Sequence, residues 1–145
     1  MRLRIFVLLA LPAVAATAFA DENAPLPTKM NGHWTAVVPG RQTYMDSLSV
    51  VLVPPSNGTG PVTGQLTLHG VTCGAIDEPL TGSWNGTELR LVSKVHPNVN
   101  SQRPNGQCGN GALTFDLKRR PGQSVFEGES TRDGSPITSQ VTLSP

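Results

Sequence analysis

The chain has 145 residues, with 11 Lys and Arg, 10 Asp and Glu, and a formal net charge of +1. This near balance argues against a nucleic-acid-binding protein, which would carry a basic excess. Glycine (15 residues) and proline (13 residues) are abundant, which is typical of short strands joined by turns and not of helices.

The first twenty residues have the pattern of an export signal. Arg2 and Arg4 precede the apolar run IFVLLALPAVAA, and Ala18-Phe19-Ala20 is a small-x-small cleavage pattern. The run is short for a membrane span, and no later stretch is apolar enough for one. We expect cleavage after Ala20 and a soluble mature chain, periplasmic or secreted, with no membrane span. A retained N-terminal anchor is the alternative.

The mature chain reads as one domain behind a short leader. Residues 21–31 are polar and contain proline, so we expect a flexible leader, followed by a single β domain at 32–145. In that domain, apolar and polar residues alternate in short runs separated by turn signals such as Asn85-Gly86, which predicts strands. The expected strands are 33–38, 47–53, 62–69, 79–84, 87–95, 112–118, 124–130 and 137–143.

Eight short strands with hairpin-length links predict an all-β, antiparallel up-and-down meander. We expect it to close into an eight-stranded barrel, because closure removes exposed strand edges. A two-sheet β-sandwich is the alternative. Gly64, Gly82 and Gly128 each follow an apolar residue by two positions, where a curved sheet bends sharply, although chance in a glycine-rich chain also explains them.

The two cysteines, Cys73 and Cys108, both lie in the mature chain. An even cysteine count in an oxidising compartment predicts one disulfide between them. Their spacing fits no zinc pattern, so we expect no metal and no cofactor.

Short motifs resemble those of avidin-like and lipocalin-like (calycin-type) eight-stranded barrels. The GHW at residues 32–34 resembles their early Gly-x-Trp, which closes one end of the barrel. The segments VTGQL and LTGSW are similar to the Thr-Gly strands of avidin-like proteins. The seventh strand has FEGES where the avidin-like pattern has tryptophan before glycine, so the resemblance implies a fold and no ligand residue.

No catalytic motif stands out, and we expect a protein that is not an enzyme. There is no Gly-x-Ser-x-Gly elbow, and a barrel with His33 opening strand one and His69 closing strand three would place them at opposite ends. Asp77 and Glu78 precede a proline and are expected to be solvated charges. The remaining candidates are expected to lie on the surface: His96, Glu127, Glu129, the turn Lys118-Arg119-Arg120, and the turn sequons at Asn57 and Asn85.

Three aromatic residues are candidates for the barrel interior. Trp34, Trp84 and Phe126 fall on the apolar faces of their strands, so each either fills a barrel end or contacts a ligand. We expect Trp84 to pack beside Trp34 or Phe126.

The longest connection, residues 96–111, is polar and includes Cys108. Structureless links of this length are often functional. The interpretation that we favour is an exported binding domain, expected to be monomeric, that engages a protein or envelope partner through this loop. The alternative is a carrier of a small apolar ligand in the barrel interior. The candidate partner-binding residues of the loop are Asn98, Asn100, Arg103, Asn105 and Gln107.

Overall fold

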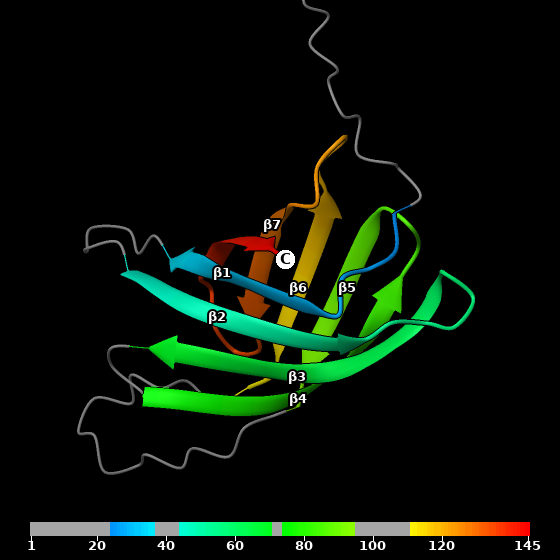
Figure 1. Cartoon of the computed structure of the whole chain (residues 1–145). Coiled ribbons are helices and arrows are strands. Elements are labelled where there is room, and N and C mark those ends of the chain that lie inside the picture. The colour runs from blue at the N-terminus through cyan, green and yellow to red at the C-terminus, as the bar shows by residue number, and fades with distance from the viewer. Residues whose placement is uncertain (1–23, 37–43, 71–73, 95–110) are drawn as a thin grey trace, which may run out of the picture.

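The computed structural model describes residues 24–36, 44–70, 74–94 and 111–145, and the described residues form eight strands and no helix. Figure 1 shows the strands wrapping around one interior. The strands are β1 (Lys29–Ala36), β2 (Tyr44–Val53), β3 (Gly60–Gly70), β4 (Gly74–Trp84), β5 (Glu88–Ser93), β6 (Leu113–Arg119), β7 (Phe126–Arg132) and β8 (Thr138–Ser144).

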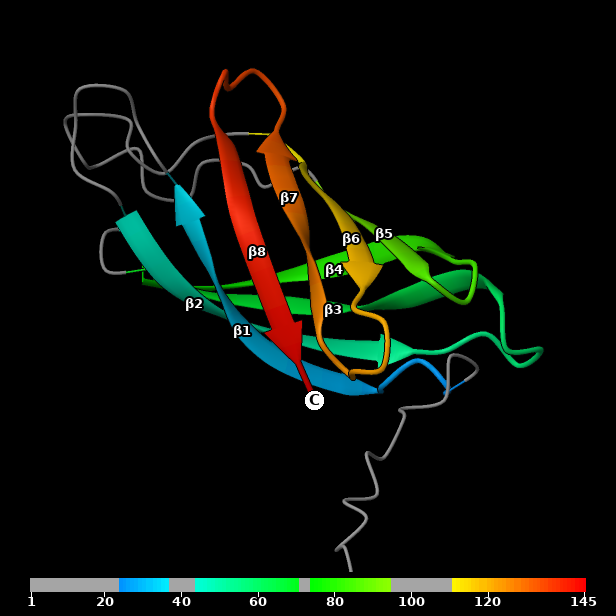
Figure 2. The ribbon, with the colours of Figure 1, turned by 90° about the horizontal axis from the view of Figure 1, so that it is seen from above.

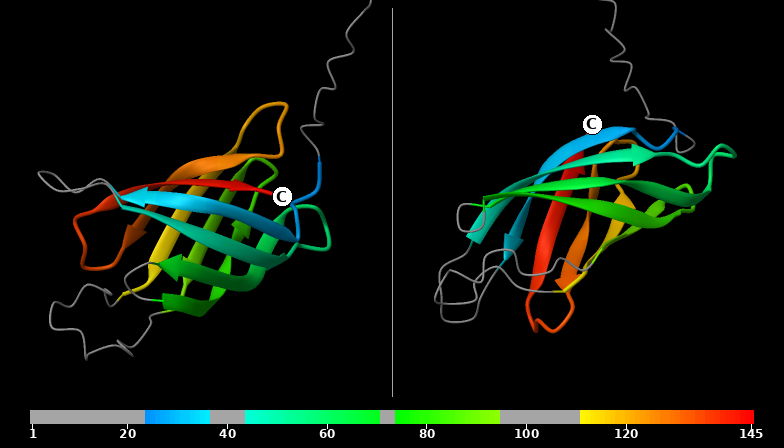
Figure 3. Two further views of the ribbon diagram at one scale, coloured as in Figure 1. Left: turned by 60° about the vertical axis from the view of Figure 1, so that its left-hand side comes forward. Right: turned by 90° about the horizontal axis from the view of Figure 1, so that it is seen from below.

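The strands form a closed antiparallel barrel in the order of the chain, which confirms the predicted up-and-down barrel and excludes the sandwich. Each strand pairs with the next, and β8 pairs with β1 from Asn31↔Ser144 to Ala36↔Ser139. Seen from above, β8 lies between β7 and β1 (Figure 2), and the C-terminal end of β8 lies beside the start of β1 (Figure 3). Closure leaves no unpaired sheet edge in the barrel.

The interior is an apolar core built from alternate residues of every strand. In β5, for example, Leu89 and Leu91 are buried whereas Arg90 between them is exposed. The predicted inward faces of β3, β4, β6 and β8 are confirmed by the same alternation. The buried hydrophobic cluster consists of Leu26, Met30, Leu48, Val50, Leu52, Val62, Leu66, Leu68, Leu80, Trp84, Leu89, Leu91, Leu113, Phe115, Leu117, Phe126, Val141 and Leu143.

Inward glycines allow neighbouring strands to approach closely. A Cβ atom on Gly82 would lie 2.0 Å from the Arg90 carbonyl oxygen, and one on Gly128 would lie 2.0 Å from that of Asp116. Gly64 and Gly32 meet carbonyl oxygens in the same way. The recurring glycines are therefore required by close backbone approach, as one of the two interpretations predicted.

The predicted Asn-Gly, Pro-Gly and Asp-Gly turns are confirmed, with positive φ at Gly86, Gly122 and Gly134. At the first of these, Asn85 Oδ1 accepts hydrogen bonds from the backbone N–H of Thr87 at 3.0 Å and of Glu88 at 2.7 Å. The side-chain amide of Asn85 is therefore part of the turn itself.

Four strands, β1 to β4, start earlier than the sequence predicts, and the differences are largest for β1 and β4. β1 begins at Lys29 rather than His33, and the preceding segment is held by burial of Leu26 and by a 2.8 Å hydrogen bond from Leu52 N to Thr28 O. β4 begins at Gly74 and so includes Asp77 and Glu78. Pairing with neighbouring strands extends both elements beyond their local signals. Among the described residues, no helix has the length and apolarity to cross a membrane.

Candidate functional site

The two ends of the barrel interior have different chemistry. We call one the plugged end, defined by Leu26, Trp84, Arg119 and Phe126. We call the other the polar end, defined by Trp34, Glu78, Ser93, Ser130, Arg132 and Ser139. Because odd and even strands run in opposite directions, the last residues of β4 and β6 lie at the plugged end, and the last residues of β1, β5 and β7 lie at the polar end.

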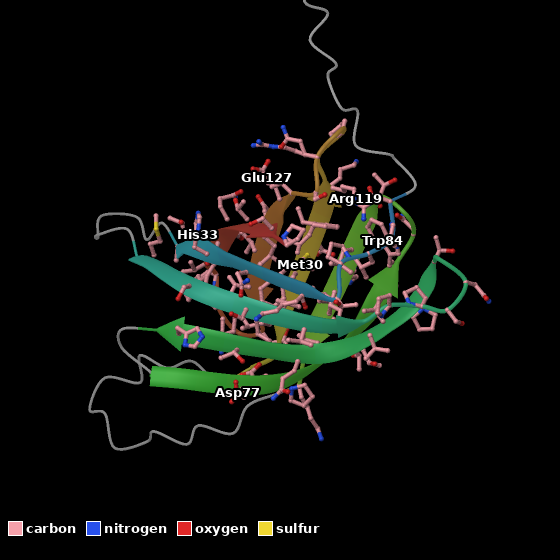
Figure 4. All side chains as sticks on the ribbon, viewed as in Figure 1. Met30, His33, Asp77, Trp84, Arg119 and Glu127 are labelled. Atoms are coloured by element: carbon pink, nitrogen blue, oxygen red, sulfur yellow. The ribbon has the colours of Figure 1, made fainter. Side chains whose placement is uncertain are left out.

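At the plugged end, Arg119 is buried against two aromatic rings. Its guanidinium carbon lies 4.8 Å from the centre of the Trp84 ring and 5.2 Å from that of Phe126. Arg119 Nη1 and Nη2 donate hydrogen bonds to the carbonyl oxygens of Ala24, at 2.5 Å, and Pro25, at 3.0 Å. Burial lowers the pKa of the Arg119 guanidinium. This end is closed by contacts within the protein, and Figure 4 shows Arg119 beside Trp84, away from His33.

The expectation that residues 118–120 form a solvated turn is therefore wrong for Arg119, which is only 8% exposed. Arg119 has the inward parity of β6, whereas its neighbours face outward. Lys118 Nζ lies 3.3 Å from Glu88 Oε1, and Arg120 makes a two-point contact with Glu127 at 2.6 and 2.8 Å. The outward placement of Glu127 is confirmed.

The three aromatic candidates do not all lie at the same end of the barrel. Trp84 and Phe126 meet edge-to-face with ring centres 5.7 Å apart, which confirms their predicted contact and assigns both to the core. Trp34 lies toward the polar end, where the backbone pairs it with Val141 of β8. Trp34, the tryptophan of the Gly-x-Trp motif, therefore does not lie at the plugged end of the barrel.

The polar end is lined by small hydroxyl side chains. Ser93, Ser130 and Ser139 are all buried, and Ser130 and Ser139 are direct partners across β7 and β8. Ser93 Oγ accepts a 2.9 Å hydrogen bond from Leu113 N, at the point where β6 begins. Inward polar residues are costly in a barrel core unless they bind a partner.

Two opposite charges also face the interior at the polar end. Glu78 is 2% exposed, so the prediction that it is a solvated charge is wrong, whereas Asp77 beside it is exposed as predicted. Leu80 pairs with Ser93, the last residue of β5, so Glu78 lies beyond the end of β5. Burial lowers the pKa of Arg132, and the Glu78 carboxylate acts in the opposite direction, which places the two groups within electrostatic reach.

The alternation of inward and outward residues along β4 indicates that Glu78 faces inward. Glu78 shares the alternation of Leu80, Gly82 and Trp84, which are the inward residues of β4. The Asp-Glu-Pro sequence favours a turn locally, so the sequence alone starts the strand too late. Pairing of β4 with the full length of β3 includes residues 74–78 in the strand, because the ladder runs from Gly60↔Trp84 to Gly70↔Gly74.

Trp34 contributes a buried hydrogen-bond donor to the polar end. Its ring packs against the core cluster and is partly buried. Its Nε1 is inaccessible to solvent and, among the residues that the structure describes, donates to no acceptor. A buried indole N–H normally has a partner, so this donor has an unused hydrogen bond.

The candidate loop residues Asn98, Asn100, Arg103, Asn105 and Gln107 lie outside the described residues, as do Cys73, Cys108 and His96. The described residues on either side nevertheless show at which end of the barrel each connection begins and ends. Residues 94 and 111 bound the long one, and residues 70 and 74 bound the one containing Cys73. All four positions lie at strand ends on the polar side of the barrel, so both connections start and finish there.

The prediction that His33 and His69 lie at opposite ends is wrong. His33 pairs with Ser47, and Ser47 pairs with His69, so the three residues form one row across the exposed face of β1, β2 and β3. The difference arises because β1 starts at Lys29, which places His33 in the second half of the strand. Within the described segments, no group of three or more metal-ligating side chains gathers.

On the outer face, an open hollow of 430 Å³ lies over β4, β5 and β6. Its charged side chains are paired across strands, with 3.3 Å between Lys118 and Glu88 and 3.7 Å between Arg90 and Asp116. Exposed pairs of this kind contribute little to binding or stability. The charged side chains of the hollow are therefore engaged with one another.

No protein-family model and no curated protein matches this sequence. Among solved structures, the chain is similar to Rv2717c from M. tuberculosis, with 12% sequence identity and a TM-score of 0.42. The match covers 91% of this chain and 98% of that chain. No family and no function is carried over from it.

Proposed function

We propose that this is an exported, non-enzymatic binding protein, periplasmic or secreted, that holds a small ligand at the polar end of its barrel. The observation that carries the proposal is the placement of Glu78 and Arg132 toward the interior at that end, while contacts within the protein close the other end. Apolar walls with a few convergent polar groups are the usual composition of small-molecule sites. An eight-stranded barrel is just wide enough either to be filled by its own side chains or to hold one small ligand.

The difference between the two ends of the barrel supports the same proposal. The eight-stranded meander has one plugged end and one polar end. A carrier requires such an asymmetry, because a ligand must enter at one end and stop at the other.

Native mass spectrometry tests the proposal. The mature protein, purified without denaturation from the cells that export it, should carry a small molecule that is lost after unfolding and refolding. Ser139→Phe fills the polar end and should abolish the adduct. Ser124→Phe, on the exposed turn after β6, is the matched control and should retain it. Retention of the adduct by Ser139→Phe would contradict the proposed site.

A second candidate places recognition of a protein or envelope partner on residues 95–110. The supporting observation is that this connection leaves β5 and reaches β6 at the polar end, so partner and interior ligand would approach the same side. Replacing residues 98–107 by a Gly-Ser linker should weaken binding to a co-purified partner at least tenfold, or about 1.4 kcal/mol. Unchanged affinity would eliminate this candidate.

A further inference from the structure

We propose that the polar end takes an uncharged, largely apolar molecule bearing an oxygen acceptor, and that Trp34 Nε1 donates a hydrogen bond to that oxygen. The inference rests on the proposed function and specifies its ligand class. It follows from one buried donor, the charges beside it and the apolar walls of the barrel.

The donor is the indole N–H of Trp34. It is buried and meets no acceptor within the described segments, although the ring packs against the core. Leaving such a group unpaired is unfavourable, and a ligand oxygen at this position would recover part of that cost. Nε1 has no acceptor capacity, so the ligand must supply the acceptor.

The charges at the polar end favour an uncharged ligand. Glu78 and Arg132 carry opposite formal charges and influence each other electrostatically. An anion attracted by Arg132 would be repelled by Glu78, and a cation attracted by Glu78 would be repelled by Arg132. A neutral molecule avoids this opposition and also avoids the desolvation of a net charge on entering the barrel.

The walls next to Trp34 favour an apolar body. Trp34 pairs with Val141, and the ladder continues from Val141 to Gly128, which has no side chain. Phe115 and Leu68 are buried on the inward faces of β6 and β3. An aromatic or aliphatic body would contact these side chains while its oxygen faces the indole N–H.

Three fluorescent probes distinguish the ligand classes. Prodan is a neutral naphthalene bearing a dimethylamino group and a propionyl ketone, dimethylaminonaphthalene keeps the ring and the amine but lacks the propionyl group, and anilinonaphthalene sulfonate is an anion of similar size. We expect prodan to bind, and each of the other two to bind at least fivefold more weakly. Fivefold corresponds to about 1 kcal/mol, the typical net contribution of one neutral hydrogen bond.

Two variants test whether Trp34 Nε1 donates the hydrogen bond to the ligand oxygen. Trp34→Phe keeps an aromatic ring but removes the N–H, and should weaken prodan about fivefold while leaving dimethylaminonaphthalene unchanged. Trp84→Phe changes the same residue type at the plugged end and should leave both affinities unchanged. Urea melts of both variants confirm that each is folded at the assay temperature.

The outcomes separate the ligand class from the proposed function. Equal affinity of prodan and dimethylaminonaphthalene, tighter binding of the sulfonate, or no effect of Trp34→Phe on prodan would overturn the ligand class alone. If Ser139→Phe failed to weaken any probe that binds, the polar end itself would be the wrong site, and the proposed function would fail with it.

Discussion

Arg119 makes four stabilising contacts from one buried side chain. It donates to two backbone carbonyls of the N-terminal segment, and its guanidinium lies against the rings of Trp84 and Phe126. Arginine suits this position because its delocalised charge is weakly hydrated and stacks on aromatic rings. The residue therefore stabilises the plugged end and is not available to steer an acidic partner.

Replacing Arg119 with alanine should destabilise the fold by about 2–4 kcal/mol, measured as the free energy of unfolding in urea. The reason is the loss of two charge-assisted hydrogen bonds and two ring contacts. Lys118→Ala, one residue earlier on the exposed face, should change stability by about 0.5 kcal/mol or less. A loss below about 1 kcal/mol at Arg119 would show that the plug contributes little.

Gly82 tests the close approach of β4 and β5. Gly82→Ala would place a Cβ atom 2.0 Å from the Arg90 carbonyl oxygen, so the two strands must separate locally. We expect a loss of about 2–3 kcal/mol from overpacking in the same urea assay. Thr81→Ala, at the exposed neighbouring position, should cost less than about 1 kcal/mol. Equal costs at the two positions would contradict the close approach.

At the scale of the strand, alternation was sufficient to predict the elements and their inward faces. The strands in which Leu66, Leu91 and Phe115 alternate with polar residues are confirmed, because the period of two is a local property of the chain. The closed barrel also follows from eight such strands with short links.

Register was not predictable from local patterns. Glu78 was expected to be a solvated charge before a proline and Arg119 to lie in a surface turn, whereas pairing with neighbouring strands places both side chains in the interior. His33 and His69 were separated because the start of β1 depends on contacts that Leu26 makes with distant strands. Local sequence patterns therefore did not predict the charged residues of the polar end and identified only the aromatic candidates.

The N-terminal segment offers a test at this scale. Leu26 is 4% exposed and belongs to the core cluster, although it precedes β1. Leu26→Ala should cost about 2 kcal/mol or more in thermal or urea unfolding, as expected for a buried leucine. Lys29→Ala, exposed at the start of β1, serves as the control. A neutral Leu26→Ala would mean that the segment does not contribute to closure.

For the molecule as a whole, the disulfide remains a prediction with a topological basis. The connections containing Cys73 and Cys108 both start and finish at the polar side of the barrel. We expect non-reducing mass spectrometry of the protein isolated from the cells that produce it to give a mass two hydrogens lower than that of the reduced chain. Closing this loop should stabilise the fold by about 3–4 kcal/mol. Two alkylatable thiols in freshly isolated protein would refute the pairing.

The central claim is that ligand recognition occurs at the polar end, and the two indole N–H resonances of the mature protein test it most directly. Trp34 and Trp84 lie toward opposite ends of the barrel, so their cross-peaks in a ¹H–¹⁵N correlation spectrum report on the two ends separately. Trp34→Phe assigns the peaks. The spectrum is recorded before and after addition of a low-molecular-weight extract of the cells that export the protein. The account predicts that the Trp34 indole peak shifts while the Trp84 peak stays in place. A shift confined to Trp84, or no shift at Trp34 under conditions in which native mass spectrometry detects a bound molecule, would contradict it.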